Sequence, residues 1–249
     1  MSNFDPNHLG YETFKHLAKD PSVNQHERVG FPAWYREGKV DLIFEDILRK
    51  CSHLNREKMR ILDIGPGWSD LTKKFLDHCS QQHHEVVLID CQEMIDLIPS
   101  YPNVTKIAAK FPEELNNIEN LGEFDVILTY SVIQYPFVET SLFKFIDSAV
   151  TLLKREGQFL AGDIPNISMK KRFLASETAK IYHEKFYAQD GNLFPEPIFN
   201  QLESDQIDDG VLMGLLVRLR MSGFHAFLLP QQAELPMANR REDLLVVRP

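Results

Sequence analysis

The residues best suited to chemistry surround a glycine turn in the stretch "LDIGPGWS", which contains Asp63, Gly65, Pro66 and Gly67. A short apolar run precedes the turn, and a segment with helical spacing follows it. A glycine turn between a strand and a helix can bring backbone N–H groups close to a ligand, because glycine has no side chain to hold the ligand away. The turn therefore predicts a binding site, and the neighbouring residues have to indicate the ligand.

Two phosphate-binding patterns do not match this turn. A P-loop requires G-x-x-x-x-G-K-[ST], and the sequence has no such lysine after the glycines. The dinucleotide fingerprint G-x-G-x-x-G would have Asp70 in place of its third glycine, where a carboxylate repels a pyrophosphate. A purely structural strand-to-helix turn, with Ser69 or Asp70 as the N-cap, stays open as an alternative.

Two acids near the turn favour a cationic ligand. Asp63 lies just before the glycines, and Asp90 ends the next apolar run, where a carboxylate can accept hydrogen bonds from both ribose hydroxyls. S-adenosylmethionine carries an ammonium, a sulfonium and a ribose but no phosphate, so it suits acids and needs no phosphate cradle. We therefore predict S-adenosylmethionine as the cofactor.

Apolar runs alternate with helical patterns through most of the chain. Strands are expected at "RILDIG", "EVVLID", "NVTKIAA", "EFDVILTYS" and "GQFLAGDI", and helices from Val40 to Cys51, at "SDLTKKFLDHCS" and at "SLFKFIDSAVTLL". This alternation predicts an α/β fold with a doubly wound, parallel sheet. The last two runs, "GFHAFLLP" and "EDLLVVRP", lack a crossover helix between them, so we expect them to pair antiparallel.

The segment before this final strand pair is longer than a crossover needs. It contains a helix pattern near Ser168 to Tyr187 and a second one that begins at Asp208 or Asp209 and ends at Gly223. We expect a helical insert that acts as a lid or binds the acceptor. The predicted organisation is a single domain, 1–249, with an N-terminal helical segment (1–55), a cofactor-binding core (56–163), the insert (164–222) and the strand pair (223–249).

Composition narrows the class of partner. A formal net charge of -9 gives no basic surface for nucleic acid, so a small-molecule acceptor is expected. No apolar run approaches the roughly 20 residues that span a bilayer, and the N-terminus does not have the pattern of a signal peptide, so we expect a cytoplasmic protein without a membrane partner. The three cysteines show no metal-binding spacing, and no metal is predicted. The sequence leaves the oligomeric state open.

With these motifs the chain resembles the class I S-adenosylmethionine-dependent methyltransferases, from Arg60 to Gly162 and in the final strand pair. The resemblance implies a Rossmann-like, mostly parallel seven-stranded sheet with an antiparallel C-terminal pair. "LDIGPGWS", "VVLID" and "FDVILTYSVIQY" are similar to the family's first, second and fourth motifs. The cofactor-binding residues that it implies are Asp63, Gly65, Pro66, Gly67, Asp90, Cys91, Thr129, Tyr130 and Ser131.

The sequence departs from the family after the third strand. An acid that reads the adenine amino group has no match there, since "IAAKFPEEL" has Lys110 and Phe111 at this point. The tail "LLPQQAELPMANRREDLLVVRP" is similar to that of a bacterial subgroup found with surface-glycan enzymes. Sugars and sugar acids are therefore among the acceptors considered.

Methyl transfer from a sulfonium is an in-line displacement with a good leaving group, so positioning of the two reactants supplies much of the rate acceleration. A dedicated base is required mainly when the acceptor is a hydroxyl group. The candidate catalytic residues are Asp163, at the end of the fifth strand, and His26 and His183. Arg240 and Arg241 are candidates for binding an anionic acceptor, because the guanidinium fork suits carboxylate and phosphate. Each of these residues can also be a solvated surface or capping residue.

The predicted function is methyl transfer to oxygen or nitrogen of a small polar molecule. Two alternatives stay open: an NAD(P)-dependent oxidoreductase, which Asp70 argues against, and a non-catalytic regulatory protein that binds the cofactor. We also expect the N-terminal segment to close over the acceptor, because Phe31, Trp34 and Tyr35 cluster without helical spacing.

Overall fold

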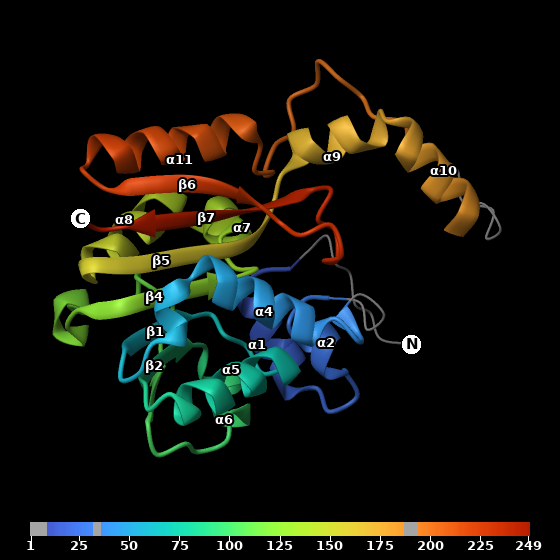
Figure 1. Cartoon of the computed structure of the whole chain (residues 1–249). Helices are drawn as coiled ribbons and strands as arrows, with labels where there is room; N and C mark the ends of the chain where they lie inside the picture. Colours follow the sequence, from blue (N-terminus) through green and yellow to red (C-terminus); the bar gives the residue numbers. More distant parts are fainter. Residues whose placement is uncertain (1–8, 32–35, 187–193) are drawn as a thin grey trace.

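The structure is a computed structural model of the chain, and it describes residues 9–31, 36–186 and 194–249. Within these residues a seven-stranded sheet has the order β3-β2-β1-β4-β5-β7-β6 (Figure 1). The strands are β1 (Arg60–Ile64), β2 (Glu85–Asp90), β3 (Val104–Ala108), β4 (Phe124–Tyr130), β5 (Leu153–Pro165), β6 (His225–Pro230) and β7 (Arg241–Val247). Strands β1 to β5 pair in parallel, and β7 pairs antiparallel with β5 and β6. The predicted fold class is confirmed.

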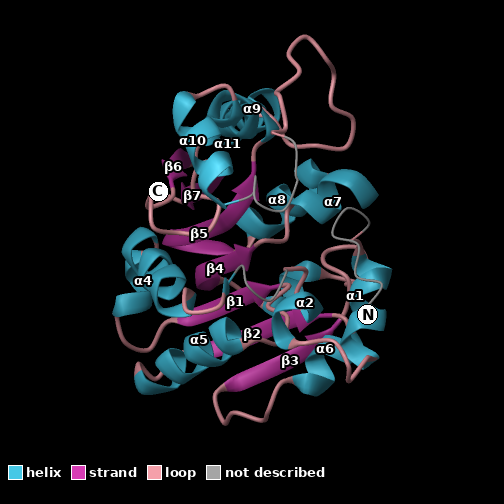
Figure 2. Ribbon diagram, turned by 90° about the vertical axis from the view of Figure 1, so that its right-hand side faces the viewer, coloured by secondary structure: helices cyan, strands magenta, loops and turns pink. Residues whose placement is uncertain are grey.

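Helices cover both faces of the sheet (Figure 2). One face carries α4 (Val40–Lys50) and α5 (Asp70–Gln81), and the other carries α8 (Leu142–Thr151) and α11 (Asp209–Met221). Side chains alternate between these two cores, because successive residues of a strand point to opposite faces. In β1, Ile61 packs in the core with α4 and α5, whereas Leu62 and Ile64 pack in the core with α8 and α11. Burial on both faces explains why the parallel strands are continuous apolar runs.

The other described helices flank these layers. They are α1 (Tyr11–Lys19), α2 (Gln25–Arg28), α6 (Gln92–Leu97), α7 (Gln134–Glu139), α9 (Ile167–Leu174) and α10 (Glu177–Phe186), with the 3-10 turns η1 (Ser52–Asn55) and η2 (Ile118–Leu121). The single helix expected from Ser168 to Tyr187 is two helices, α9 and α10, and Tyr187 lies outside the described residues. Ser176 separates them, because its Oγ accepts the N–H of Ala179 at 3.3 Å and so caps the start of α10.

Strand β5 is irregular near its end. Its pairing with β7 shifts between Ala161 and Ile164, and Asp163 within this bulge has a φ of 58°. The Asp163 N–H donates to Oδ1 of Asp243 at 2.7 Å. Bulges redirect side chains, and this one brings the Asp163 carboxylate against the hydroxyl of Ser131, the first residue after β4.

A buried ion cluster joins α4 to β7. Lys50 Nζ lies 2.5 Å from Oδ2 of Asp46 and also contacts Asp243. Both acids are 1% exposed, so the ammonium of Lys50 compensates two carboxylates that have little access to water. Because Asp243 also accepts the N–H of Asp163, this cluster holds the β5 bulge in place.

Lys50→Met is expected to lower the free energy of unfolding by about 3–5 kcal/mol, because removing one partner of a buried ion pair leaves uncompensated charge. Urea denaturation at pH 7 measures this change. Lys73→Met, at an exposed position of α5, is the control and should change the stability by no more than about 0.5 kcal/mol. A Lys50→Met effect as small as the control's would show that the cluster contributes little to stability.

Candidate functional site

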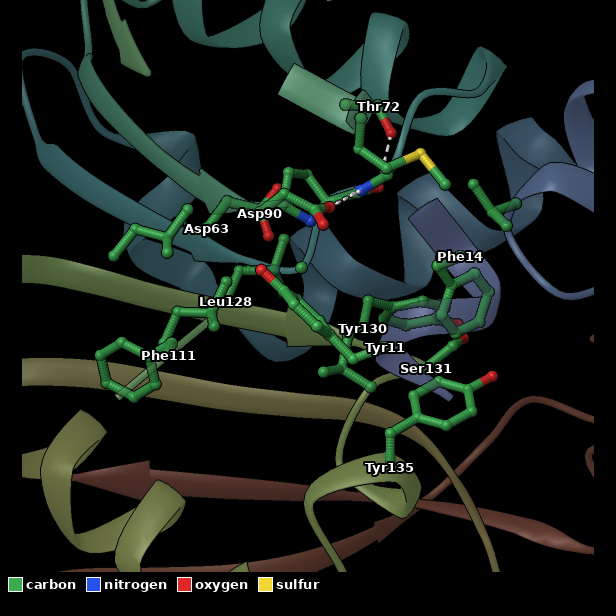
Figure 3. A pocket seen from close by; sticks show the side chains of 18 of the residues that line it. Tyr11, Phe14, Asp63, Thr72, Asp90, Phe111, Leu128, Tyr130, Ser131 and Tyr135 are labelled. Atoms are coloured by element: carbon green, nitrogen blue, oxygen red, sulfur yellow. Dashed lines mark hydrogen bonds between the residues drawn. The ribbon is translucent and has the colours of Figure 1, made fainter. Parts of the chain in front are cut away.

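A pocket lies at the carboxyl ends of β1, β2 and β4. The strand order reverses at β1 and β4, and open α/β sheets bind their ligands at such switch points. The glycine turn after β1, the end of β2, the loop after β4 and the N-terminal segment form its walls (Figure 3). These segments meet only in the folded protein.

The glycine turn requires both of its glycines. Gly65 and Gly67 have φ angles of 73° and 59°, in the left-handed region that side chains disfavour. A Cβ on Gly65 would lie 2.8 Å from Val132, and one on Gly67 would lie 2.6 Å from Val29. The absence of side chains lets the loop after β4 and the N-terminal segment pack against the turn.

Asp90 connects the end of β2 to the glycine turn. Its Oδ2 accepts the N–H of Gly67 at 2.9 Å (Figure 3). Its Oδ1 accepts the N–H of Cys91 at 2.7 Å. Burial raises the pKa of Asp90, while these two N–H groups act in the opposite direction. The carboxylate is thus fixed in the pocket wall before any ligand binds, and its remaining lone pairs can accept further hydrogen bonds.

Asp63 lies in the pocket wall beside Asp90 (Figure 3). It is 5% exposed, and no described residue donates a hydrogen bond to its carboxyl group. Burial raises the pKa of Asp63 to about 8, and the negative charge of Asp90 adds to the shift. A buried acid that lacks a donor and faces a pocket suits a ligand that brings positive charge or N–H groups.

Three further residues predicted to bind the cofactor also line the pocket: Pro66, Tyr130 and Ser131. The Pro66 carbonyl accepts the hydroxyl of Thr72 at 2.9 Å, which ties the turn to α5. Ser131 has a φ of 63°, and its N–H donates to the carbonyl of Gly162 at 2.9 Å. The fourth motif therefore ends in a backbone turn held by β5.

The remaining two predicted cofactor residues, Cys91 and Thr129, are not among the described residues that line the pocket. Cys91 packs with Ala18 and Met94 in a separate apolar cluster, where burial raises its pKa to about 12. The Thr129 hydroxyl donates to the carbonyl of Ile64 at 2.9 Å and so joins β4 to β1. Both residues support the walls of the pocket from behind.

The N-terminal segment covers the pocket with aromatic side chains. Tyr11 and Phe14 of α1 line it with Tyr135 (Figure 3). Phe31 also lines it. The rings of Phe14 and Tyr135 meet edge to face with centroids 4.9 Å apart, and the Tyr11 N–H donates to Oε1 of Glu139 at 2.8 Å. These contacts attach α1 to α7.

Phe31 thus occupies the position expected of a residue that closes over the site, whereas Trp34 and Tyr35 lie outside the described residues. The sequence predicted closure by the N-terminal segment but did not single out the residues of α1. The only sequence signal for α1 is the helical spacing of Tyr11, Phe14 and Ala18.

Beyond Asp90, residues that follow β3 complete the pocket. Lys110 and Phe111 line it in the place where the family's adenine-reading acid has no match. The Lys110 ammonium lies 3.0 Å from Oε2 of Glu139, and Phe111 packs edge to face on Phe145 with centroids 5.3 Å apart. This end of the pocket is therefore apolar, with its nearby cation neutralised.

A buried polar cluster forms the wall next to Ser131. Arg36 Nη2 donates to Ser131 Oγ at 2.7 Å and lies 3.4 Å from Oδ2 of Asp163. Arg241 Nη1 lies 3.2 Å from the same oxygen. Arg36 and Ser131 line the pocket, while Asp163 holds them from behind. No sequence pattern distinguished Arg36 from the other arginines of the chain.

The other candidates for acceptor chemistry lie at different places. His26 is on α2, and its buried Nδ1 has no hydrogen-bond partner among the described residues. His183 is on α10, where its ring packs edge to face on Phe194 with centroids 5.4 Å apart. Arg240 lies over the ring of Phe173 on α9, 5.7 Å from its centroid. None of these three candidates lines the pocket. No described residue of the insert, 164–222, lines it either.

No group of three or more His, Cys, Asp or Glu residues in the described ranges has an arrangement that suits a metal ion. In the same residues, no helix combines the length and apolar character needed to cross a bilayer.

Solved structures resemble this one along nearly its whole length, although no protein-family model and no curated protein matches the sequence. The plantazolicin methyltransferase BpumL, in complex with a monoazolic desmethylPZN analog and SAH, has a TM-score of 0.58 at 12% identity over 96% of each chain. The N-methyltransferase NodS from Bradyrhizobium japonicum WM9, in complex with S-adenosyl-l-homocysteine, has a TM-score of 0.52 at 14% identity, over 96% of this chain and 98% of NodS. The chain has the methyltransferase fold.

A third structure with the methyltransferase fold is an O-methyltransferase family protein from Burkholderia thailandensis. It matches with a TM-score of 0.53 at 14% identity, over 96% of this chain and 64% of that one. At these identities the likeness concerns the fold, and the methyltransferase fold supports more than one acceptor chemistry. The pocket residues of this chain therefore have to carry any argument about its ligands.

Asp63→Asn is expected to remove a pH dependence of stability from the ligand-free protein. The ordinary pKa of the carboxyl is 3.8 and its folded-state pKa is about 8, so the folded state holds the proton more tightly. The wild-type protein should therefore lose stability as the pH rises from about 4 to about 8, whereas an amide does not titrate. Urea denaturation at pH 5 and pH 8 should show the variant gaining on the wild type by more than about 1.4 kcal/mol, the equivalent of one pKa unit.

Glu45→Gln, an exposed acid on α4, is the control for this measurement and should show no such gain. A stability difference between wild type and Asp63→Asn that is the same at both pH values would contradict a buried, unpartnered carboxyl at this position.

Proposed function

We propose that the protein transfers a methyl group from S-adenosylmethionine to an oxygen or nitrogen atom of a small polar acceptor. The observation that carries this proposal is the pair of acids, Asp63 and Asp90, at a glycine turn in the pocket of a methyltransferase fold. No described residue donates a hydrogen bond to Asp63, and Asp90 is held by two backbone N–H groups. Such a pair suits a ligand with an ammonium and two vicinal hydroxyls.

The residues of the pocket fit S-adenosylmethionine at each of its ends. Asp63 would accept the ammonium, and Asp90 would accept the ribose hydroxyls. The side chains of Met94 and Phe111, with Ala109, form an apolar surface beyond Asp90 that would hold the adenine. When bound, this cofactor supplies an electrophilic methyl group on a sulfonium.

The chain itself contributes exclusion of water and alignment. Tyr11, Phe14 and Tyr135 cover the pocket, and a covered site favours a displacement in which charge moves from the sulfonium to the acceptor. We propose Asp163 as a positioning residue, because its carboxylate holds Ser131 and Arg36 in the pocket wall. An amine acceptor needs no dedicated base. For a hydroxyl acceptor, Asp163 is the predicted base that contacts residues of the pocket wall, whereas His26 and His183 would have to approach the acceptor from outside the pocket lining.

Sugars and sugar acids stay in the proposal as acceptor classes because the tail of the sequence is similar to a glycan-associated subgroup. The start of α5 argues against the alternative function, an NAD(P)-dependent oxidoreductase. There Asp70, with its Oδ2 2.5 Å from Nε2 of Gln25, puts a carboxylate where a pyrophosphate would bind.

The proposal is tested first by binding. In thermal unfolding, S-adenosylhomocysteine and S-adenosylmethionine at a hundred times their dissociation constants should each stabilise the protein by about 2.7 kcal/mol, and NADH should not. Asp90→Ala is expected to lose at least tenfold in affinity, because the ribose hydroxyls lose their acceptor. Asp96→Ala, at an exposed position of α6, is the matched control and should keep the wild-type affinity.

Activity is tested with methyl-labelled S-adenosylmethionine and panels of amines, sugars and sugar acids. Transfer of label to an acceptor, abolished in Asp90→Ala, is the expected result. Stabilisation by NADH alone would overturn the choice of cofactor. Binding without transfer to any small molecule of a cell extract would instead favour the non-catalytic alternative.

A further inference from the structure

Helix α11 is apolar on two opposite sides. The inner side packs in the core with α8 through four leucines: Leu212, Leu215, Leu216 and Leu219. The outer side presents Met213, Val217 and Met221, which are 54, 57 and 84% exposed. In Figure 1, α11 forms the outer layer beyond β6. A helix that is apolar all round is normally covered on both sides, so the outer side of α11 indicates a contact with another molecule.

We propose that the outer face of α11, formed by Met213, Val217 and Met221, binds the same face of a second copy of the chain in a two-fold symmetric dimer. Such dimers are the commonest homo-oligomers, and in each of them one surface patch meets itself. The inference goes beyond the proposed function and does not rest on it. No described residue of α11 lines the pocket at the glycine turn, so the contact would form away from both pockets.

The spacing of the three apolar residues is symmetric about Val217. Met213 lies four residues before it and Met221 four residues after it, so the three side chains form one row along the helix. In a two-fold dimer, every contact is repeated with the two copies exchanged. Two antiparallel α11 helices that cross at Val217 would place Met213 of each copy against Met221 of the other. One arrangement thus covers all three side chains.

Gly214 lies beside the same face and leaves room for a second helix. A shallow hollow there is lined by Met213, Gly214, Val217, Arg218, Met221 and Ser222. A Cβ on Gly214 would meet no atom of the described residues within 4 Å. Packing within the chain therefore does not require this glycine, although glycine makes a helix less stable than alanine does. A contact between helices explains it, because a small residue lets two helix backbones approach closely.

The charges beside the face are complementary to themselves. Arg218 on α11 and Asp147 on α8 form an exposed pair, with Nε of Arg218 2.9 Å from Oδ1 of Asp147. A face that binds its own copy needs both signs of charge, because a face of one sign would repel its copy. A two-fold axis at Val217 would bring two such pairs together, and each Arg218 could then also donate to Asp147 of the other copy.

Other parts of the surface are less suited to self-association. The chain has a net charge of -9, so two copies repel each other over most of their surfaces, whereas α11 from Gly210 to Met221 contains two arginines and no acid. The edge strand β6 is also protected. Arg220 donates to the carbonyl of Ala226 from Nε at 3.0 Å and from Nη2 at 2.7 Å, and Pro230 at the end of β6 has no N–H. Pairing through this edge is therefore disfavoured.

Sedimentation equilibrium tests the dimer. Wild type should reach twice the mass of the chain, with a dissociation constant of about 10 μM or tighter. Val217→Glu places two like charges at the axis and should raise the dissociation constant at least tenfold. Its far-UV circular dichroism should match that of wild type, because the position is more than half exposed. Leu202→Glu, at a 99% exposed apolar position before α11, is the matched control and should dimerise as wild type does.

Gly214→Leu separates a specific contact from general adhesion of apolar surfaces, and it serves if Val217→Glu fails to fold. The substitution removes a glycine from a helix and adds exposed apolar area, so general adhesion would become stronger. It also fills the hollow that the second helix occupies, so the proposed dimer should weaken at least tenfold. A Gly214→Leu dimer as tight as wild type or tighter would overturn the inference.

Val217→Cys tests the register of the two helices. The three native cysteines are buried, so mild oxidation should act on the introduced thiol. Oxidised Val217→Cys should migrate as a covalent dimer in a non-reducing gel, because the two introduced thiols meet at the axis. Leu202→Cys, treated in the same way, should stay monomeric.

Three further results would overturn the inference. They are a wild type that is monomeric at about 100 μM, a dimer whose dissociation constant Val217→Glu leaves unchanged, and a Val217→Cys that cross-links no more than Leu202→Cys. A monomeric wild type that floats with phosphatidylglycerol vesicles in a density gradient would assign this face to a membrane surface instead.

Discussion

The buried carboxylate of Asp163 constrains the arrangement of most of the carboxyl edge of the sheet. A charge taken out of water needs nearby opposite charge and hydrogen-bond donors, and here they come from distant parts of the chain. Arg36 comes from the N-terminal segment, Ser131 from the turn after β4, and Gln231 and Arg241 from the final strand pair. Arg36, which compensates the charge of Asp163, thereby ties the N-terminal segment to the pocket that this segment covers.

Asp63 presents the opposite case in the same pocket. It is nearly as buried as Asp163, yet no described residue donates to its carboxyl group. The contrast separates two acids that look alike in the sequence: Asp163 is compensated by residues from distant segments, whereas Asp63 has no donor among the described residues. The ligand-free protein gives up stability at Asp63, a compromise typical of binding sites.

The methyltransferase fold explains the position of the pocket but not the choice of ligand. BpumL, NodS and the Burkholderia thailandensis protein are 12 to 14% identical to this chain, and a common fold accommodates many acceptors. What is particular to this protein lies in the parts that close the pocket. The aromatic residues of α1 and the guanidinium of Arg36 form a wall that is both apolar and positively charged.

The sequence by itself determined the parallel sheet, its antiparallel edge, the glycine turn and its two acids. Each of these depends on local signals: apolar periodicity, glycine at positions of positive φ, and acids directly before or after a strand. Only the tertiary structure decided that Thr129 and Cys91 lie behind the pocket and that Arg36 lies in it. The physical reason is that burial and charge compensation act between residues far apart in the chain, and an arginine in a loop has no sequence signature for its partner.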